Sequence, residues 1–224
     1  DKIKALVLNY PNNPTTKTVN KDFYEEVVKI CIRHKIWILS DLAYAEIYFD
    51  NIPPPSILEV KNAKKIAVEF TSVSKTYSMP GWRIGFACGN PILIAALAKI
   101  KSYLDYGAFT PIQVAATAAL NGPQQCIQDI RNVYLERRDV LIESMARCEW
   151  NIPVPNSTMF VWAEIPKKFK AKGSLYFAKH LLKKAGMAVA PGVGFGSNGE
   201  GYVRISLVEN KQRIRQAFRN YKQY

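Results

Sequence analysis

The strongest candidates for a chemical function in this sequence are a lysine and an arginine that lie eight residues apart. Lys75 follows the apolar stretch 66–70 in the run Ser72-Val73-Ser74-Lys75, and Arg83 lies in a Gly-Trp-Arg turn before another apolar stretch. Desolvation at the mouth of a buried strand favours the neutral amine of a lysine, which is then a candidate Schiff-base nucleophile. Ser72 and Arg83 suit a phosphate group beside it, as a neutral donor and a forked cation. The alternative, and the usual one for an isolated Ser-x-x-Lys, is an exposed lysine in a strand-to-loop turn.

Asn13 and Asp41 are two further polar residues that come after apolar stretches, at 3–9 and 36–40. These stretches are continuously apolar and alternate with helical patterns, which predicts an α/β fold with a mostly parallel sheet covered on both faces. Ligands bind beyond the carboxyl ends of the strands in such sheets, so we expect Asn13, Asp41 and Lys75 to converge on one crevice. Taken singly, Asn13 is explained as a turn residue and Asp41 as a helix or turn cap.

The sequence predicts a larger and a smaller domain. In the first part we expect strands over 3–9, 36–41, 66–70 and 85–88, a helix over 21–34 capped by Asn20, a short helix after the prolines at 53–55, and a helix begun by Asn90-Pro91. A helix over 123–148 follows, and about 25 helical residues span about 40 Å, enough to bridge two domains. Strands over 159–165, 187–190 and 202–208, with helices over 174–185 (Ser174 as cap, Gly186 as stop) and from 210, predict a small α+β domain. We place the large domain, linking helix included, at 1–140 and the small domain at 141–224.

A glycine-rich loop and one arginine in the smaller domain need separate interpretation. Residues 194–199 formally match GxGxxG, but they precede a strand rather than a helix, so we reject a dinucleotide site and expect a mobile or closely packed loop. Arg204 lies in an apolar strand between Val203 and Ile205. A partly buried arginine needs a carboxylate or phosphate partner, which a ligand or an internal salt bridge would supply.

The composition, 48% hydrophobic and 22% charged over 224 residues, is that of a globular protein. No run approaches the roughly 18 apolar residues of a membrane span. The four cysteines have no CxxC or zinc-ligand spacing, so we expect reduced thiols in a cytoplasmic protein, and two histidines give little support to metal or Ser-His chemistry. The net charge of +13 is spread along the chain, which favours a solvated surface, and we predict neither a nucleic-acid nor a membrane partner.

Four motifs stand out when the chain is taken as a whole. They are Asn12-Asn13-Pro14-Thr15, Ser40-Asp41-Leu42-Ala43-Tyr44, Ser72-Val73-Ser74-Lys75 with Arg83 eight residues on, and Tyr202-Val203-Arg204. Together these motifs resemble those of the class I/II aminotransferases, pyridoxal-phosphate-dependent enzymes of fold type I. They cover nearly the whole chain, and the sequence around them most resembles the bacterial alanine (glutamate–pyruvate) aminotransferases, although Thr16 stands where many members have glycine.

The resemblance implies a catalytic centre around pyridoxal 5′-phosphate. Lys75 would form the Schiff base with the cofactor and shuttle the proton between the substrate Cα and cofactor C4′. Asp41 would pair with the pyridinium nitrogen and keep the ring an electron sink. Tyr44 and Asn13 would hydrogen-bond the phenolic oxygen of the ring.

The resemblance also implies how the phosphate and the substrate are held. Ser72 and Arg83 would bind the cofactor phosphate, and Arg204, with Asn13, would bind the substrate α-carboxylate. The implied reaction is transamination between an L-amino acid and a 2-oxo acid, with alanine and 2-oxoglutarate or pyruvate as the favoured pair. Aspartate, methionine and diaminopimelate stay open as donors.

The resemblance covers only the C-terminal part of the family. The part outside it supplies a phosphate-binding loop, a ring stacked on the cofactor, and residues lent across a homodimer interface. We therefore expect this chain alone to be a fragment, inactive or weak, with exposed apolar sheet edges that favour association. The alternatives are a pyridoxal-phosphate-dependent C–S lyase, the effector domain of an aminotransferase-like transcriptional regulator, and a non-catalytic remnant.

Overall fold

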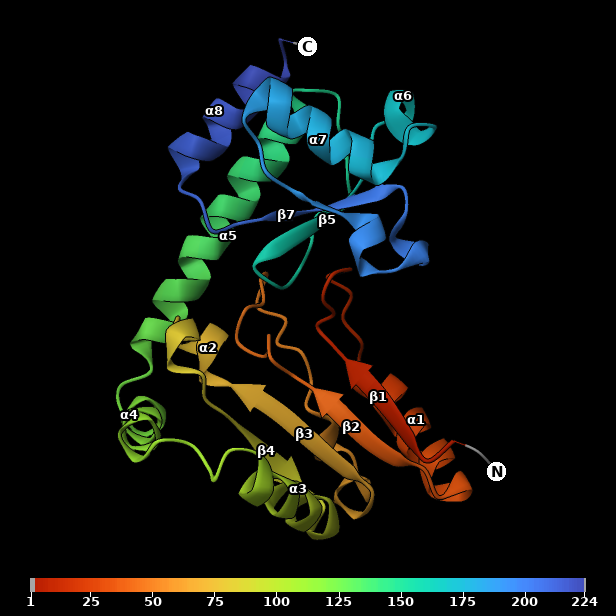
Figure 1. Ribbon diagram of the computed structural model, residues 1–224, viewed down its shortest axis with the longest axis vertical. Helices are drawn as coiled ribbons and strands as arrows, with labels where there is room; N and C mark the ends of the chain where they lie inside the picture. Colours follow the sequence, from red (N-terminus) through yellow and green to blue (C-terminus); the bar gives the residue numbers. More distant parts are fainter. Residues whose placement is uncertain (1–2, 224) are drawn as a thin grey trace. The chain divides into compact units, whose positions relative to one another are not determined.

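The chain forms two compact units, and the computed structural model describes residues 3–223 (Figure 1). The first unit comprises the described residues up to 12 together with 17–131. The second comprises residues 13–16 together with those from 132 onward. The boundary that we predict from the sequence, between 140 and 141, and the division between 131 and 132 both fall inside one long helix, α5 (Gln125–Ala146).

The first unit is built on a four-stranded sheet in the order β1-β2-β3-β4. The first three strands are parallel, and β4 runs antiparallel to β3. A predominantly parallel sheet with intervening helices agrees with the α/β fold that the sequence predicts. The strands are β1 (Ala5–Asn9), β2 (Trp37–Asp41), β3 (Ala67–Ser72) and β4 (Gly85–Gly89).

Helix α1 (Lys21–His34) covers one face of this sheet (Figure 1). Asn20 caps it as predicted, because its side chain accepts a hydrogen bond from the Phe23 amide at 3.0 Å. The core beneath joins α1 to the sheet and to the turns that precede β3. The other helical segments are α2 (Val73–Thr76), α3 (Pro91–Leu104) and α4 (Thr110–Asn121), with 3₁₀ turns η1 (Ile57–Glu59), η2 (Ala63–Lys65) and η3 (Pro80–Trp82).

The prediction that helices cover both faces of the sheet is wrong at β1. Leu8 is buried on the α1 face, whereas Val7, on the opposite face, is 68% exposed. Side chains alternate between the two faces of a strand, so one face of β1 lacks cover from residues 3–223. This is the exposed apolar surface that we expect at a sheet edge.

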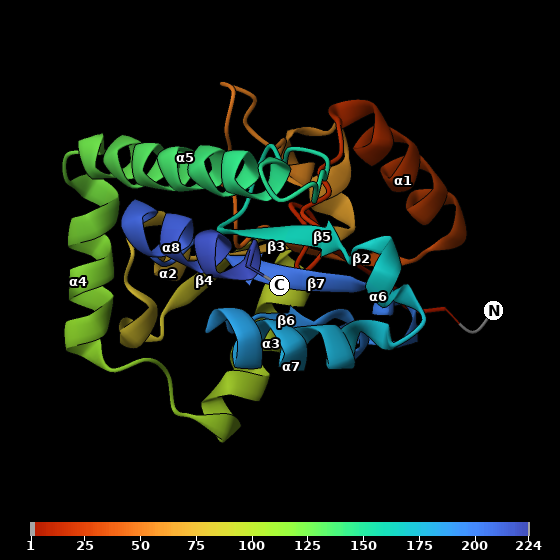
Figure 2. The same ribbon diagram turned by 90° about the horizontal axis from the view of Figure 1, so that it is seen from above.

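The second unit packs helices against a small antiparallel sheet in the order β5-β7-β6 (Figure 2). Trp150 lies in its core, where the ring stands edge-on to Phe177 and the indole N–H donates to the Glu164 carbonyl at 2.7 Å. The elements are β5 (Phe160–Glu164), β6 (Ala190–Pro191), β7 (Tyr202–Ser206), α6 (Lys167–Lys170), α7 (Gly173–Ala185) and α8 (Lys211–Tyr221), with 3₁₀ turns η4 (Gly192–Phe195) and η5 (Ser197–Gly199).

Two local predictions fail in this unit. Ser174 is not the cap of α7, since Lys172 holds that position and Ser174 binds the Glu200 carboxylate through its amide and its hydroxyl. The strand expected over 187–190 shrinks to Ala190–Pro191, because the Met187 amide is bound to the Leu181 carbonyl at the end of α7. Gly186 ends α7 as predicted, with a left-handed φ of 65°.

The glycine-rich loop is closely packed only where Gly192 meets Gly199, whereas residues 193–198 are exposed. A Cβ on Gly192 would overlap the Gly199 carbonyl, and one on Gly199 would overlap the Gly192 carbonyl. Among residues 3–223, no helix combines the length and the apolarity that a bilayer crossing requires.

Candidate functional site

Asp41 and Lys75 lie at the same edge of the first unit's sheet. Asp41 is the last residue of β2, and Lys75 comes three residues after the end of β3. The two strands are neighbours and parallel, with Asp41 in register with Phe70. Adjacent parallel strands end at one edge, so these two residues meet the expectation of a shared location.

The turn after β2 fixes Asp41 and buries Tyr44. The Leu42 amide donates to the Phe70 carbonyl at 2.9 Å, which extends the sheet pairing by one residue. Asp41 Oδ1 accepts from the Ala43 amide at 3.1 Å, so the turn-cap function considered from the sequence is present. The Asp41 side chain is exposed despite this hydrogen bond, whereas Tyr44 is only 8% exposed.

The connection from β3 to β4 holds Ser72, Lys75 and Arg83. Ser72 Oγ caps α2 by accepting from the Ser74 amide at 3.1 Å. Arg83 has a left-handed backbone, with φ of 53°, and its Nη1 donates to the Pro80 carbonyl at 2.9 Å. Gly85 lets the returning strand approach closely, because a Cβ there would lie 2.5 Å from the Thr71 carbonyl oxygen.

The charged side chains at this edge have N–H donors that are available to a ligand. The amine of Lys75 forms no hydrogen bond or ion pair with residues 3–223, and the guanidinium of Arg83 binds only the Pro80 carbonyl within that range. A free amine and a largely free guanidinium at the same end of the sheet as a carboxylate suit a molecule with an electrophilic carbon and an anionic group.

Asn13 and Arg204 form a pair in the second unit. Arg204 Nη1 donates to Asn13 Oδ1 at 2.7 Å, although 191 residues separate them. The guanidinium also lies 4.7 Å from the ring centroid of Phe195 and 5.1 Å from that of Phe160. The alternative of an internal salt bridge is wrong, because no carboxylate within residues 3–223 pairs with Arg204. Its remaining donors suit a carboxylate ligand.

The structure thus assembles the seven predicted residues in two groups. Five lie at one edge of the first unit's sheet, and two form the pair in the second unit. The union of both groups in one crevice stays a prediction. The first group is Asp41, Tyr44, Ser72, Lys75 and Arg83, and the second is Asn13 and Arg204.

Residues that the sequence analysis missed support the first group. Glu69, within the apolar run of β3, accepts hydrogen bonds from Ser40, Ser56 and the Ile57 amide. A lone acid in an apolar strand was a signal that could have identified it. Arg131 contacts Glu46 across 85 residues of sequence, and nothing in the neighbouring sequence distinguishes it from the other arginines of α5.

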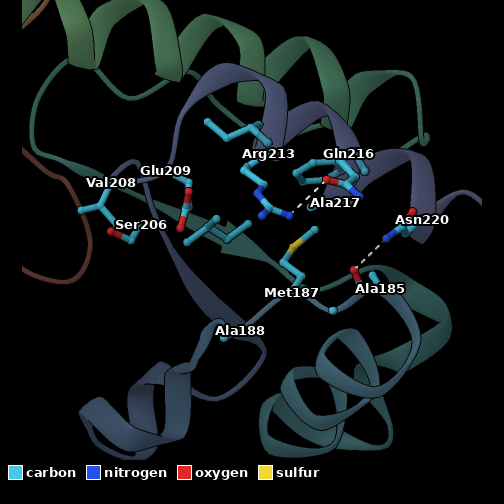
Figure 3. A pocket seen from close by; sticks show the side chains of 14 residues that line it. Ala185, Met187, Ala188, Ser206, Val208, Glu209, Arg213, Gln216, Ala217 and Asn220 are labelled. Carbon is cyan, nitrogen blue, oxygen red and sulfur yellow. Dashed lines mark hydrogen bonds between the residues drawn. The ribbon is translucent and has the colours of Figure 1, made fainter.

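A groove of about 590 Å³ in the second unit contains none of the predicted site residues (Figure 3). It opens where residues 187–189 fail to pair with β7, and Met187, Ser206 and Arg213 contribute to its lining. Arg213 Nη1 donates to Gln216 within the groove at 3.4 Å. Its lining has no unpaired lysine or carboxylate cluster that would match the chemistry expected at the sheet edge.

Comparison with known proteins identifies the family. Residues 1–219 match the family described as aminotransferase class I and II. This chain belongs to the class I and II aminotransferases. Its relatives include the putative aminotransferase AatC of Rhizobium meliloti strain 1021, 60% identical over 98% of this chain, and the glutamate-pyruvate aminotransferase AlaC of Escherichia coli K12, 50% identical over 99% of it. The chain spans about half the length of these relatives, 54% in each case.

Solved structures confirm the fold of this aminotransferase chain. It superposes on substrate-bound BacF from Bacillus subtilis with a TM-score of 0.93 and 37% identity, over 98% of this chain and 56% of the other. An aspartate aminotransferase double mutant from Thermus thermophilus gives 0.89 and 28% identity over the same shares. The α/β, fold-type I architecture predicted from the sequence is therefore confirmed.

Membership of this family implies pyridoxal 5′-phosphate as the cofactor, and the donor set fits it. The unpaired amine of Lys75 suits the aldehyde, and the exposed carboxylate of Asp41 suits the pyridinium nitrogen. Ser72 and Arg83, in the connection from β3 to β4, offer a hydroxyl and a guanidinium to the phosphate.

Proposed function

We propose that the protein to which this chain belongs catalyses transamination between an L-amino acid and a 2-oxo acid. The observation that carries the proposal is the unpaired amine of Lys75 at the same sheet edge as the carboxylate of Asp41. Pyridoxal phosphate, when bound, supplies an electron sink for the charge that develops when the substrate loses its Cα proton.

In this proposal Lys75 holds the cofactor through its aldehyde and moves the proton at the substrate Cα. A primary amine without an internal partner suits both tasks, because no existing ion pair has to break first. Asp41 keeps the pyridinium nitrogen protonated, and Tyr44 donates to the phenolic oxygen. The burial of Tyr44 restricts the positions that its hydroxyl reaches.

Arg204 binds the α-carboxylate, and Asn13 orients it. The hydrogen bond from Nη1 to Asn13 Oδ1 fixes the plane of the guanidinium, and the rings of Phe160 and Phe195 limit its rotation. A planar fork held in this way presents two parallel N–H groups to a carboxylate. This arrangement recognises the α-carboxylate, which all amino acids share, and does not discriminate between their side chains.

We propose alanine as the amino donor and 2-oxoglutarate or pyruvate as the acceptor. The 50% identity with the glutamate-pyruvate aminotransferase of E. coli supports this choice. A second candidate is LL-diaminopimelate, since the LL-diaminopimelate aminotransferase of Natranaerobius thermophilus is 46% identical over 99% of this chain. We further propose a homodimer, which the exposed apolar side chains of α3 and the following loop support, and a cytoplasmic location, which the four free thiols support.

The first experiment is a visible absorption spectrum with added pyridoxal phosphate, for the parent chain and for Lys75→Ala. We expect a cofactor band in the parent and none in the variant. The substrate follows from adding alanine, LL-diaminopimelate or aspartate to the full-length protein and identifying the product. A 2-oxo acid without ammonia supports transamination, whereas pyruvate with ammonia from a cysteine conjugate would assign a C–S lyase. An equal band in both proteins would refute the role of Lys75.

A further inference from the structure

Arg131, near the start of α5, binds the segment that carries Tyr44. The side chain of Arg131 is only 14% exposed and makes three polar contacts. Its Nε donates to the Glu46 carbonyl at 3.1 Å, its Nη2 pairs with the Glu46 carboxylate at 2.9 Å, and its Nη1 donates to Gln128 at 2.9 Å. The guanidinium carbon lies 3.7 Å from the ring centroid of Tyr48. A lysine could not reproduce this fork and stack.

Glu46 is two residues beyond Tyr44 and five beyond Asp41. The segment between them is held at its start by the sheet, through the Leu42 amide, and by turn hydrogen bonds from the amides of Ala45 and Ile47. These turn bonds are local. Arg131 adds a long-range attachment, which holds both the backbone and the side chain of Glu46.

Gln124, the residue before α5, binds the turn that carries Lys75. Tyr77, two residues after Lys75, donates its hydroxyl to Gln124 Oε1 at 2.8 Å. Gln124 is itself fixed, because its amide donates to the carbonyls of Ala119 and Gly122. Burial raises the pKa of Tyr77, so its hydroxyl stays protonated and able to donate.

These attachments meet around one cavity. A cavity of about 160 Å³ is bounded by Glu46 from the Tyr44 segment, by Thr76 and Tyr77 from the Lys75 turn, and by Gln124 and Ile127 from the α5 side. The two catalytic segments therefore share one support. We name Gln124, Gln128 and Arg131 the α5 clamp.

We propose that Arg131 is a positioning residue: through the α5 clamp it fixes the segment 42–48 and so sets where the Tyr44 hydroxyl meets the cofactor. This inference rests on the proposed function in one respect, which is that Tyr44 acts on the cofactor. The clamp itself is a property of the cofactor-free chain. The two parts can therefore be tested separately.

The first test measures hydrogen exchange in the cofactor-free chain for Arg131→Gln and Arg131→Lys. A matched control is Arg147→Gln, which removes the same charge at the residue directly after α5, where the side chain is 71% exposed. Hydrogen bonds to charged groups are strong enough that we expect the Ala45 and Ile47 amides to exchange about ten- to hundredfold faster in Arg131→Gln. Arg131→Lys should give a smaller increase, and the Leu42 amide, held by the sheet, should be unchanged.

The second test follows the visible band of bound pyridoxal phosphate against pH. Arg131→Gln should shift the midpoint of this titration in the same direction as Tyr44→Phe, and it should add nothing in the Tyr44→Phe background. A residue that only stabilised the fold would not produce this dependence on Tyr44.

The outcomes separate the clamp from the proposed function. Equal exchange in Arg131→Gln and Arg147→Gln would overturn the clamp. Faster exchange with an unshifted midpoint, or an equal shift in the Tyr44→Phe background, would overturn the positioning role. The absence of a Lys75-dependent band in the parent would refute the cofactor site of this chain, and the positioning role with it, while the exchange data would still decide whether the clamp exists.

Discussion

Glu69 is a carboxylate buried within β3, and its replacement tests how the sheet edge that carries the candidate site is held. It is 8% exposed, and its Oε1 accepts from Ser56 Oγ at 2.6 Å. Its Oε2 accepts from the Ile57 amide at 3.1 Å and from Ser40 Oγ at 3.3 Å. Ser40 directly precedes Asp41, and Ser56 lies at the end of the loop that follows it. Glu69 therefore ties together both ends of that loop.

The substitution Glu69→Gln keeps the shape of the side chain but replaces one acceptor oxygen by an NH₂ donor. At least one of the three donors then loses its partner in a region where Ser40 is 1% exposed. A buried donor left unsatisfied costs about 1–3 kcal/mol, and a hydrogen bond to a charged group contributes about 1.5–3 kcal/mol. We expect Glu69→Gln to lower the free energy of unfolding by about 2–3 kcal/mol. Glu69→Ala should cost more, because it leaves all three donors without their acceptor.

Urea unfolding followed by circular dichroism measures this change. The matched control is Glu26→Gln, an exposed position on α1, where we expect a change within about 0.5 kcal/mol. If Glu69→Gln and Glu26→Gln have the same midpoint, the carboxylate is not what holds the loop, and the reasoning from buried hydrogen bonds fails.

Three further predictions concern the substrate, alkaline stability and the phosphate. Arg204→Lys keeps the charge but loses the fork that Asn13 orients, so kcat/KM for an amino acid should fall about 10- to 100-fold, mainly through KM, and an unchanged KM would refute the carboxylate role. Burial, and then the charge of Glu69, raise the pKa of Tyr24, so its contribution to stability is complete below the ordinary tyrosine pKa of about 10 and is lost as the pH rises beyond it. Tyr24 Oη has no hydrogen-bond partner among residues 3–223, so Tyr24→Phe should change urea unfolding little at neutral pH but reduce the alkaline loss, and a loss equal to the parent's would contradict this. Ser72→Ala removes the α2 cap and should cost the cofactor-free chain about 0.5–2 kcal/mol. It should also weaken binding of pyridoxal phosphate more than that of pyridoxal, and equal weakening of both would exclude a phosphate contact.

The sequence was most informative where a local rule decides the structure. Asn20 marked the start of α1 and Gly186 the end of α7, because capping depends on one side chain or one φ angle. It failed where a partner outside the local pattern decides. Ser174 resembles a cap, but Glu200, 26 residues away, takes both its amide and its hydroxyl. The Met187 segment has the composition of a strand, but its Met187 amide donates to the Leu181 carbonyl at the end of α7.

The same contrast applies to the candidate site. Lys75 and Asp41 were found because strand order places residues after parallel strands at one edge, a rule that needs no side-chain contacts. Arg131 was not found, because its contact with Glu46 depends on how α5 meets a loop 85 residues earlier. No periodicity encodes such a contact. Supporting residues of this kind become visible only in three dimensions.

The hydroxyl of Ser72 shows how the structure refines a role taken from a motif. Ser72 Oγ lies 3.1 Å from the Ile84 carbonyl and 2.9 Å from Ser74 Oγ, and it accepts from the Ser74 amide at 3.1 Å. A hydroxyl donates only one hydrogen bond, so a donation to phosphate must replace the one that it makes within the chain. If the Ser74 hydroxyl donates to Ser72 Oγ, the proton of Ser72 is free to leave the Ile84 carbonyl for the phosphate, and the contact between the two serines is kept. The phosphate contact that we propose for Ser72 would therefore depend on Ser74 as well, a residue that the motif alone leaves without a role.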